Sequence, residues 1–507
     1  MLTTLAAPAF ADIWHIENGD ITISAGESGN NVTQNNNTTY GDTNTIITNQ
    51  NKDKASSHTV TIETNDKNDK VEVTLKDVNI DTSSRNKAAV SVTGSGNTTI
   101  KLDGDNALKS DTYRSGIYGS GSGSLTISGG ENDSLTAQGG SGANGISSNG
   151  SLTISGGTVT AKGGSGEDGY GGRGIISTKS VTISGGTVEA NGGNGNSGGD
   201  GITSNGGVTI SGGSTVTANG GNGGSLVGGS GISNGGSLTV SDGTVTAKGG
   251  NGDSKDGYGG DGIRSGGVVT ISGNTVNAAG GYGGKVGGYG ICSFDRVAIS
   301  GGTVEAAGGN GSTGGGSGIY SSVIDLSGSL ELTAKAGSPN GKALSQRGSE
   351  LVLDTIKDKL GPGAKVTATD ADGKVIDQVP IPRPVEPEKP VIPEESSSSS
   401  DGGSATPSAP ASPLPGLTVT DKDGQRISYT STQSGNTLTV CVGRLTASFR
   451  ISLAALRQLR AEGIETITFQ TILCSTTLSV DELLAMGGED AEAVLTHRFT
   501  DSSLTVG

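Results

Sequence analysis

The side chains best suited to binding chemistry lie in glycine-rich segments that recur along the middle of the chain. Tyr170 and Tyr258 occupy equivalent positions in two copies of the sequence DGYGG, and Tyr289 lies in a later segment. Arg173 and Arg264 follow the first two tyrosines closely. A tyrosine ring can stack against the face of a sugar, and a guanidinium group can donate to sugar hydroxyls. These segments therefore predict a carbohydrate-binding edge, with tyrosines that merely cover loop backbone as the alternative.

Acidic residues accompany the tyrosines in the same segments. Asp200 and Asp261 are candidate partners for sugar hydroxyls, and Asp168 and Asp256 are candidate calcium ligands. Carboxylates and backbone carbonyls suit Ca²⁺, and GGSGEDGYG (163–171) fits one copy of a calcium-binding nonapeptide. Such sites form between stacked tandem copies, and the next nine residues break the pattern. Calcium is thus a candidate cofactor, with solvated loop charges as the alternative.

The spacing of the acids argues against catalysis. Glu189 and Glu305 fall four repeats apart, which corresponds to about 19 Å if repeats stack as parallel strands. A carboxylate pair acting on one glycosidic bond needs a separation of about 5–10 Å. Asp200 and Asp261 come nearer, about 10 Å by the same count, but they lie on glycine-rich loops. We therefore predict no catalytic residues, and an enzyme acting on polyuronates is a less favoured reading.

A repeat of about 28–29 residues must position these side chains. The dipeptide Gly-Ile marks each unit, and two further apolar positions keep step with it over seven units. The Gly-Ile isoleucines are Ile117, Ile146, Ile175, Ile202, Ile232, Ile263, Ile291 and Ile319. Each unit holds three short runs in which apolar residues alternate with Ser or Thr, which is the period of a half-buried strand. Three strands per unit predict one coil of an all-β parallel solenoid.

The chain divides by composition into five parts. We expect a signal-peptide remnant at 1–11, an N-terminal cap with the first coils at 12–115, and glycine-rich coils with a tapering end at 116–378. A Pro/Ser-rich linker at 379–416 precedes a small α+β domain at 417–507. In that domain Ser452 and Ser479 are expected helix N-caps.

Charge and composition argue against some classes of partner and indicate where the protein is located. The net charge is −16 and the basic residues are scattered, so nucleic acid is not an expected partner. No apolar run reaches the roughly 18 residues of a membrane span. The start MLTTLAAPAFA ends in an A-x-A pattern typical of signal-peptide cleavage, so an extracellular or cell-surface location is expected. Cys441 and Cys474 could form a disulfide, or remain as free thiols.

The repeated SLTISGGTVTAKGG and the stretch VEVTLKDVNI resemble the glycine-rich surface proteins of Gram-positive gut bacteria that are often labelled carbohydrate-binding. The resemblance covers roughly residues 12–345 and implies a right-handed parallel β-helix. The best functional analogue in that group is a β-helix that binds polygalacturonate in association with calcium. With a net charge of −16, a polyanionic glycan would be repelled unless cations bridge it.

Together these features predict a non-catalytic protein that uses a β-helix edge to bind a polysaccharide or a cell-wall glycan. The alternative is a structural or adhesive stalk that displays the C-terminal domain to a host or bacterial surface protein. The Thr-x-Thr runs are also similar to ice-binding solenoids, but Glu189, Asn277 and Glu305 interrupt them. Threonine is in any case a favoured exposed strand residue, so ice binding is a less favoured reading.

Overall fold

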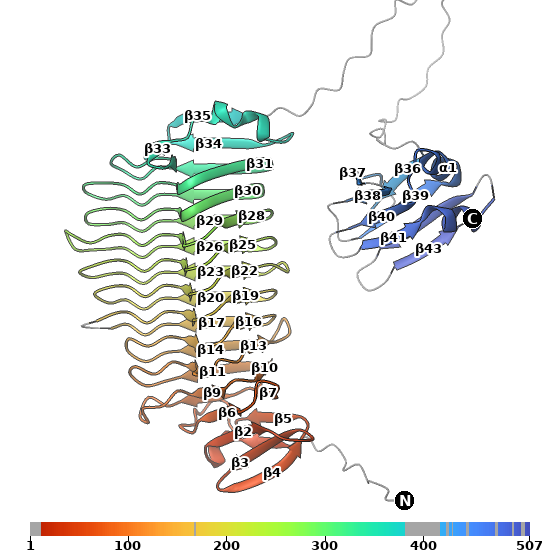
Figure 1. The fold of residues 1–507 in the computed structure, drawn as a ribbon. Helices are drawn as coiled ribbons and strands as arrows, with labels where there is room; N and C mark the ends of the chain where they lie inside the picture. Colours follow the sequence, from red (N-terminus) through yellow and green to blue (C-terminus); the bar gives the residue numbers. More distant parts are fainter. Residues whose placement is uncertain are drawn as a thin grey trace, which may run out of the picture. The chain divides into compact units, whose positions relative to one another are not determined.

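The computed structural model describes two compact units, one within residues 1–388 and one within 389–507 (Figure 1). The described residues are 12–166 and 169–380 in the first unit. In the second they are 416–421, 425–427, 429–434, 436–442, 446–471, 475–488, 491–497 and 502–506. The expected signal peptide at 1–11 and nearly all of the expected linker at 379–416 lie outside these residues.

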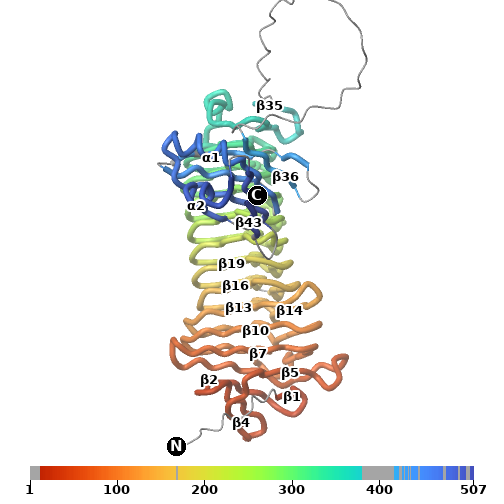
Figure 2. Tube along the Cα trace, turned by 90° about the vertical axis from the view of Figure 1, so that its right-hand side faces the viewer, coloured from red at the N-terminus to blue at the C-terminus, as the bar shows by residue number. Residues whose placement is uncertain are grey.

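The first unit is a parallel β-solenoid of about 14 turns, as the repeat predicts (Figures 1 and 2). Each regular coil contributes one strand to each of three parallel sheets, here called sheets 1, 2 and 3 in chain order. Equivalent strands pair in register from coil to coil, with Ile146 opposite Ile175 and Val159 opposite Val188. The repeat length is therefore the length of one coil.

The strands of sheet 1 are β2 (Ile21–Ala25), β6 (Val60–Thr64), β9 (Val90–Gly94), β12 (Ile117–Gly119), β15 (Ile146–Ser148), β18 (Ile175–Ser177), β21 (Ile202–Ser204), β24 (Ile232–Asn234), β27 (Ile263–Ser265) and β32 (Leu344–Gln346). Those of sheet 2 are β1 (Ile13–His15), β5 (Thr45–Thr48), β7 (Lys70–Lys76), β10 (Asn97–Asp103), β13 (Leu125–Ser128), β16 (Leu152–Ile154), β19 (Val181–Ile183), β22 (Val208–Ile210), β25 (Leu238–Val240) and β28 (Val269–Ile271). Those of sheet 3 are β8 (Asn79–Asp81), β11 (Asp105–Lys109), β14 (Ser134–Gln138), β17 (Thr158–Lys162), β20 (Thr187–Asn191), β23 (Thr215–Asn219), β26 (Thr244–Lys248), β29 (Thr275–Ala279) and β34 (Lys365–Thr369). Two long strands, β30 (Ile291–Ala307) and β31 (Ile319–Lys335), pass through all three sheets.

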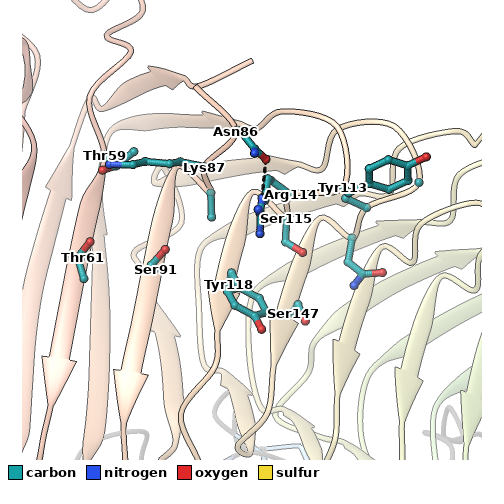
Figure 3. Close-up of a pocket in the computed structure, with 14 residues that line it drawn as sticks. Thr59, Thr61, Asn86, Lys87, Ser91, Tyr113, Arg114, Ser115, Tyr118 and Ser147 are labelled. Atoms are coloured by element: carbon teal, nitrogen blue, oxygen red, sulfur yellow. Dashed lines mark hydrogen bonds between the residues drawn. The ribbon is translucent and has the colours of Figure 1, made fainter. Parts of the chain in front are cut away.

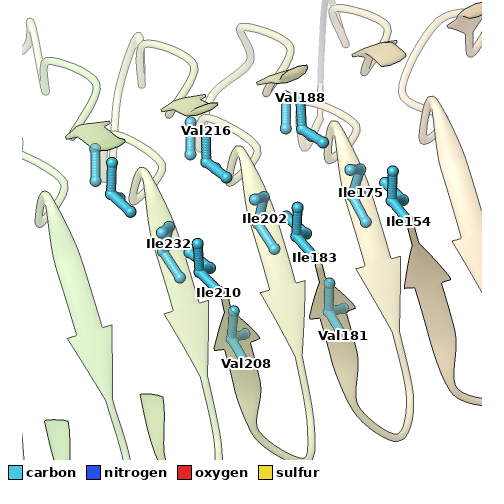
Figure 4. Packing of buried hydrophobic residues seen from close by; sticks show 14 of the residues in the cluster. Ile154, Ile175, Val181, Ile183, Val188, Ile202, Val208, Ile210, Val216 and Ile232 are labelled. Atoms are coloured by element: carbon cyan, nitrogen blue, oxygen red, sulfur yellow. The ribbon is translucent and has the colours of Figure 1, made fainter. Parts of the chain in front are cut away.

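The core is a stack of aliphatic ladders inside the coils (Figure 4). Ile154, Ile183 and Ile210 form one ladder from sheet 2, and each is fully buried. Val188 and Val216 belong to a second ladder from sheet 3. Because the side chains of a strand alternate between faces, the intervening Ser and Thr residues point outward. Among the described residues no aromatic side chain is buried in the solenoid core, as expected for such a narrow, close-packed interior.

The glycine-rich segments form ordered loops that connect sheet 3 of one coil to sheet 1 of the next. Each loop has an outgoing and a returning limb, and backbone hydrogen bonds run between the limbs of successive loops. Gly221 N–H donates to Gly199 O, Gly229 N–H to Gly221 O, and Gly250 N–H to Gly229 O, each at 2.8 Å. A Cβ atom on Gly221 would overlap the carbonyl group of Gly193 in the preceding coil. Glycine is required here because the backbones touch directly.

Antiparallel strands close both ends of the solenoid. At the N-terminal end, within the segment expected to form a cap, β3 (Asn30–Gln34) pairs with β2 and with β4 (Asn37–Asp42). At the other end β35 (Val375–Pro380) pairs with β34, and β33 (Ser349–Glu350) pairs with β32. Short 3-10 helices η1 (Ile16–Asn18), η2 (Leu353–Thr355) and η3 (Lys357–Lys359) accompany these ends. Such caps cover sheet edges that would otherwise pair with another chain.

Asp20 ties the N-terminal cap to the next two coils. Its Oδ1 accepts from Arg85 Nη1 at 2.6 Å and from Thr59 N–H at 2.9 Å, and Lys87 Nζ lies 3.2 Å from its Oδ2. Partial burial alone would raise the pKa of Asp20, but the hydrogen bonds from Arg85, Thr59 and Lys87 outweigh it and hold this pKa well below its usual range. The ionised form is therefore stabilised in the folded state.

We expect Asp20→Asn to destabilise the cap near neutral pH. The pKa of Asp20 is lower in the folded state than in the unfolded state. Its contribution to the free energy of unfolding is therefore fully present above the unfolded-state pKa of about 4, and it is lost as the pH falls toward the folded-state pKa. The difference in unfolding midpoint between wild type and variant should therefore shrink steadily below pH of about 4. Urea titrations across this range measure it, and a difference that grows on acidification would contradict the assignment.

The described residues of the second unit form two four-stranded sheets and two α-helices, in line with the predicted α+β class. One sheet joins β36 (Leu417–Thr420), β39 (Ala447–Ser452), β42 (Glu492–His497) and β43 (Ser502–Val506); the other joins β37 (Thr430–Ser434), β38 (Thr437–Cys441), β40 (Thr466–Gln470) and β41 (Ser475–Ser479). Helices α1 (Leu453–Ala461) and α2 (Val480–Ala485) begin at the predicted caps, since Ser452 Oγ accepts from Ala455 N–H and Ser479 Oγ from Glu482 N–H. The unit has its own core around Phe449 and Phe469.

Candidate functional site

One open groove gathers all seven residues that the sequence singles out for ligand binding. The returning limbs of five successive glycine loops form one wall, and the outward face of sheet 1 forms the floor. Its volume is about 600 Å³, and Tyr170, Arg173, Asp200, Tyr258, Asp261, Arg264 and Tyr289 all line it. We call this the loop groove. It runs along the solenoid axis, because each coil supplies the same loop and strand positions.

Asp200 and Asp261 occupy the residue before Gly-Ile, where they bond to the following coil. Asp200 Oδ1 accepts from Ser230 N–H at 2.7 Å, and Asp261 Oδ1 accepts from Tyr289 N–H at 2.8 Å. Asn144, at the same position of an earlier coil, accepts from Arg173 N–H at 2.9 Å. These side chains therefore hold the wall of the groove together. Only the second carboxylate oxygen of each aspartate faces other side chains.

The Oδ2 atoms of Asp200 and Asp261 each lie near an arginine side chain that also lines the groove. Asp261 Oδ2 lies 3.0 Å from Arg264 Nη1, and Asp200 Oδ2 lies 3.6 Å from Arg173 Nε. The Asp261 side chain is only 6% exposed, and this burial raises the pKa of Asp261 even though Tyr289 N–H and Arg264 favour the ionised form. The Arg264 side chain is half exposed and lies over the ring of Phe294 at 5.1 Å. Arg173 and Arg264 thus present donors to the groove while their charges are paired.

The tyrosines differ in how freely they face the solvent. Tyr170 is 76% exposed, and Tyr258 is partly exposed with the Lys285 ammonium 5.5 Å from its ring centre. Tyr289 is stacked on Tyr320 with ring centres 4.9 Å apart, which fixes its orientation. Tyr170 and Tyr258 therefore offer the ring surfaces available to a ligand, and Tyr289 closes one end of the groove.

Sequence reasoning missed part of this groove. Val227 and Val286 line it between and beside the tyrosines, and Val227 pairs with Tyr258 in a parallel bridge. Ser233 shares the outward strand position of Arg264 in the preceding coil. Alignment of the loops on Gly-Ile would have placed Ser233 beside Arg264, but the variable loop lengths hide the equivalence of Val227 and Tyr258.

A second groove, which the sequence analysis missed entirely, lies over the first coils (Figure 3). Its volume is about 630 Å³, and we call it the N-terminal groove. It is lined by Thr59, Thr61, Asn86, Lys87, Ala88, Ser91, Tyr113, Arg114, Ser115, Tyr118, Gly142, Ala143, Asn144 and Ser147. The signal in the sequence is Tyr118, which takes the outward position of sheet 1 that Arg264 takes later.

The remaining predicted sites have separate outcomes. Asp168 lies outside the described residues and Asp256 is exposed, so calcium binding stays a prediction. Over the part of the chain that is described, no three His, Cys, Asp or Glu side chains gather as a metal site. Cys441 has a free thiol whose Sγ lies 3.4 Å from Gln470 Oε1, and Cys474, its candidate disulfide partner, lies outside the described residues. Cys292 is buried, which with the nearby Asp261 raises its pKa to about 12.

Neither α1 nor α2, the α-helices among the described residues, has the length and hydropathy that a membrane crossing requires. Comparison of the chain with protein-family models, with curated proteins and with solved structures finds no match.

Proposed function

We propose that the protein is a non-catalytic carbohydrate-binding protein, secreted or held at the cell surface, that binds a polysaccharide in the loop groove. One observation carries the proposal: tyrosine rings, guanidinium groups and carboxylates from four of the five coils line a single open groove. Sugar sites combine an apolar ring surface with a few polar groups that fix orientation.

The shape of the loop groove favours a polymer over a small molecule. The groove is open and follows the solenoid axis, and successive coils place equivalent backbone positions along it at a spacing of about 4.8 Å. The side chains at these positions differ from coil to coil, as Tyr170, Ser197, Val227 and Tyr258 do, so a chain of sugar units could contact several coils through different groups. The carboxylates of Asp200 and Asp261 are bonded to backbone N–H groups, which gives them a structural role and argues against general acid or base catalysis.

Removal of an exposed groove ring should weaken binding. We expect Tyr170→Ala and Tyr258→Ala each to lower the affinity of the full chain for a glycan selected on an array by about 2- to 10-fold, because a stacked ring contributes about 0.5–1.5 kcal/mol. Tyr40→Ala is the matched control, since Tyr40 on β4 is as exposed as Tyr170 but lies in the cap. The array is probed with and without calcium, and calcium dependence would implicate the loop aspartates.

The second candidate function is a stalk that displays the C-terminal unit to a protein or cell wall. The observation in its favour is that the C-terminal unit is compact and has a core of its own. A blank array in both conditions, or equal losses in Tyr40→Ala and the two groove variants, would favour the stalk. A pull-down with the C-terminal unit would then be the next measurement.

A further inference from the structure

We propose that the N-terminal groove is a second binding site, and that it takes an acidic saccharide whose anionic group contacts Arg114. The N-terminal groove shares no lining residue with the loop groove, although the two adjoin where Arg173 N–H donates to Asn144 Oδ1, so substitutions can test each site separately. The argument rests on the charges in the groove, its exposed rings and its backbone conformation.

The charged side chains that line the N-terminal groove are both basic. Arg114 Nε donates to Asn86 Oδ1 at 2.9 Å, which orients the guanidinium group and leaves its terminal nitrogens without a carboxylate partner among the described residues (Figure 3). Lys87 is paired with Asp20, which Arg85 also holds. A fixed guanidinium with open donors is the group that best recognises a carboxylate or a sulfate.

The two aspartates next to the N-terminal groove, Asp20 and Asp111, accept hydrogen bonds from other residues. Asp111 Oδ2 accepts from Asn86 N–H at 2.9 Å, and its Oδ1 accepts from Thr112 N–H at 2.7 Å. Asp20 lies outside the lining and is held by Arg85, Lys87 and Thr59. The lining itself therefore carries the two basic side chains, Lys87 and Arg114, and no acidic one, although the whole chain carries a net charge of −16. Salt screens the interaction between exposed charges over about 10 Å, so a ligand in the groove is affected mainly by the charges close to it and little by the net charge of the whole chain.

Two exposed tyrosine rings indicate a saccharide. Tyr113 is 79% exposed and Tyr118 is 42% exposed, and Tyr118 stands on the floor of the groove on β12 (Figure 3). Ser91 and Ser147 lie opposite Tyr118 on the two neighbouring strands, and Thr59 and Thr61 line the same groove. Large exposed rings beside neutral hydroxyls suit the apolar face and hydroxyls of a sugar ring.

The backbone at Tyr113 supports a functional role for its ring. Tyr113 has φ of 58°, in the left-handed region that a bulky residue rarely adopts. Its N–H donates to Ser141 O at 3.0 Å in the next loop, which holds this conformation. Strained residues that the surrounding structure enforces gather at binding sites. The conformation places the ring at the rim of the groove, above Gly142 of the next coil.

The test uses calorimetry on the full chain with three β-1,4-linked glucose oligomers of equal length. They differ only at carbon 6, which is the carbon of a carboxylate, bears a sulfate ester on its oxygen, or belongs to the neutral hydroxymethyl group. We expect either acidic oligomer to bind at least about tenfold more tightly than the neutral one, because an ionic hydrogen bond to Arg114 forms only with an anion. Comparison of the carboxylate oligomer with the sulfate oligomer distinguishes a uronate ligand from a sulfated sugar. Raising the salt concentration should weaken the binding of both acidic oligomers.

Arg114→Gln should remove about tenfold or more of the affinity for the acidic oligomer and leave the neutral oligomer unchanged. Tyr118→Ala should weaken the binding of both the acidic and the neutral oligomers. Tyr118→Phe should leave the affinity for both unchanged because the ring remains. Arg296→Gln removes the same charge from an exposed position of β30 outside both grooves, and it should have no effect.

Four results would overturn the proposal. The first is that neither acidic oligomer binds, and the second is that Arg296→Gln and Arg114→Gln reduce binding equally. The third is that a polyglutamate peptide binds as tightly as the acidic oligomer with the same dependence on Arg114. The fourth is that Tyr258→Ala abolishes acidic-oligomer binding while Arg114→Gln does not, which would place the ligand in the loop groove and leave the proposed function intact.

Discussion

Gly221→Ala is expected to destabilise the solenoid by about 1–3 kcal/mol, because a new methyl group would be forced into a closely packed contact between coils. A Cβ at position 221 would overlap the carbonyl group of Gly193 in the coil before it. The N–H of Gly221 also donates to Gly199 O, and its carbonyl accepts from Gly229 N–H. The loop cannot move aside without breaking these bonds, which join the two limbs of this loop to each other and to the preceding loop.

Gly224→Ala is the matched control in the same loop. The nearest atom to a Cβ at position 224 is Gly195 O at 3.5 Å, an ordinary van der Waals contact. We expect its unfolding midpoint in guanidinium, followed by far-ultraviolet circular dichroism, to stay close to wild type. If Gly221→Ala and Gly224→Ala had equal effects, glycine would be needed in these loops only for chain flexibility and not for the contact between coils.

Asp261→Ala should cost about 3 kcal/mol or more, because it leaves one buried donor unsatisfied and one partly buried charge unpaired. Asp261 Oδ1 accepts from Tyr289 N–H, and Oδ2 pairs with Arg264. Tyr289 is itself stacked on Tyr320, so the loss should also disorder one end of the loop groove. Glycan affinity measured on the same variant should fall together with stability.

Asp261→Asn separates the two roles of this side chain. Its amide oxygen can still accept from Tyr289 N–H, as Asn144 already does for Arg173 N–H at the equivalent position. Only the charge opposite Arg264 is lost, and burial already disfavours that charge. We expect a stability loss well below that of Asp261→Ala. Equal losses in the two variants would show that the ion pair, rather than the bond between coils, is the main contribution.

The organisation of the solenoid could be predicted from the sequence because its physical causes are local and periodic. Alternation of apolar and hydroxyl residues specifies which side of a strand is buried, so the ladders of Ile154 and Val159 follow from spacing alone. A helix start likewise needs only a capping residue and its neighbours, which is why Ser452 and Ser479 were identified. Stacking also predicts that equivalent loop residues lie together, and this brought Tyr170, Arg173 and Asp261 to one groove.

The tertiary structure alone decided what these side chains do. Asp200 and Asp261 were expected to face a ligand, but each bonds to the backbone of the next coil, and only three-dimensional register shows which donor they reach. Asp20 and Arg85 lie 65 residues apart and meet because the cap folds onto the coils. The N-terminal groove depends in the same way on the contact between Arg114 and Asn86, which lie 28 residues apart in neighbouring turns. A pattern in one coil carries no information about such contacts, since hydrogen bonds and burial are set by neighbours that are distant in the chain.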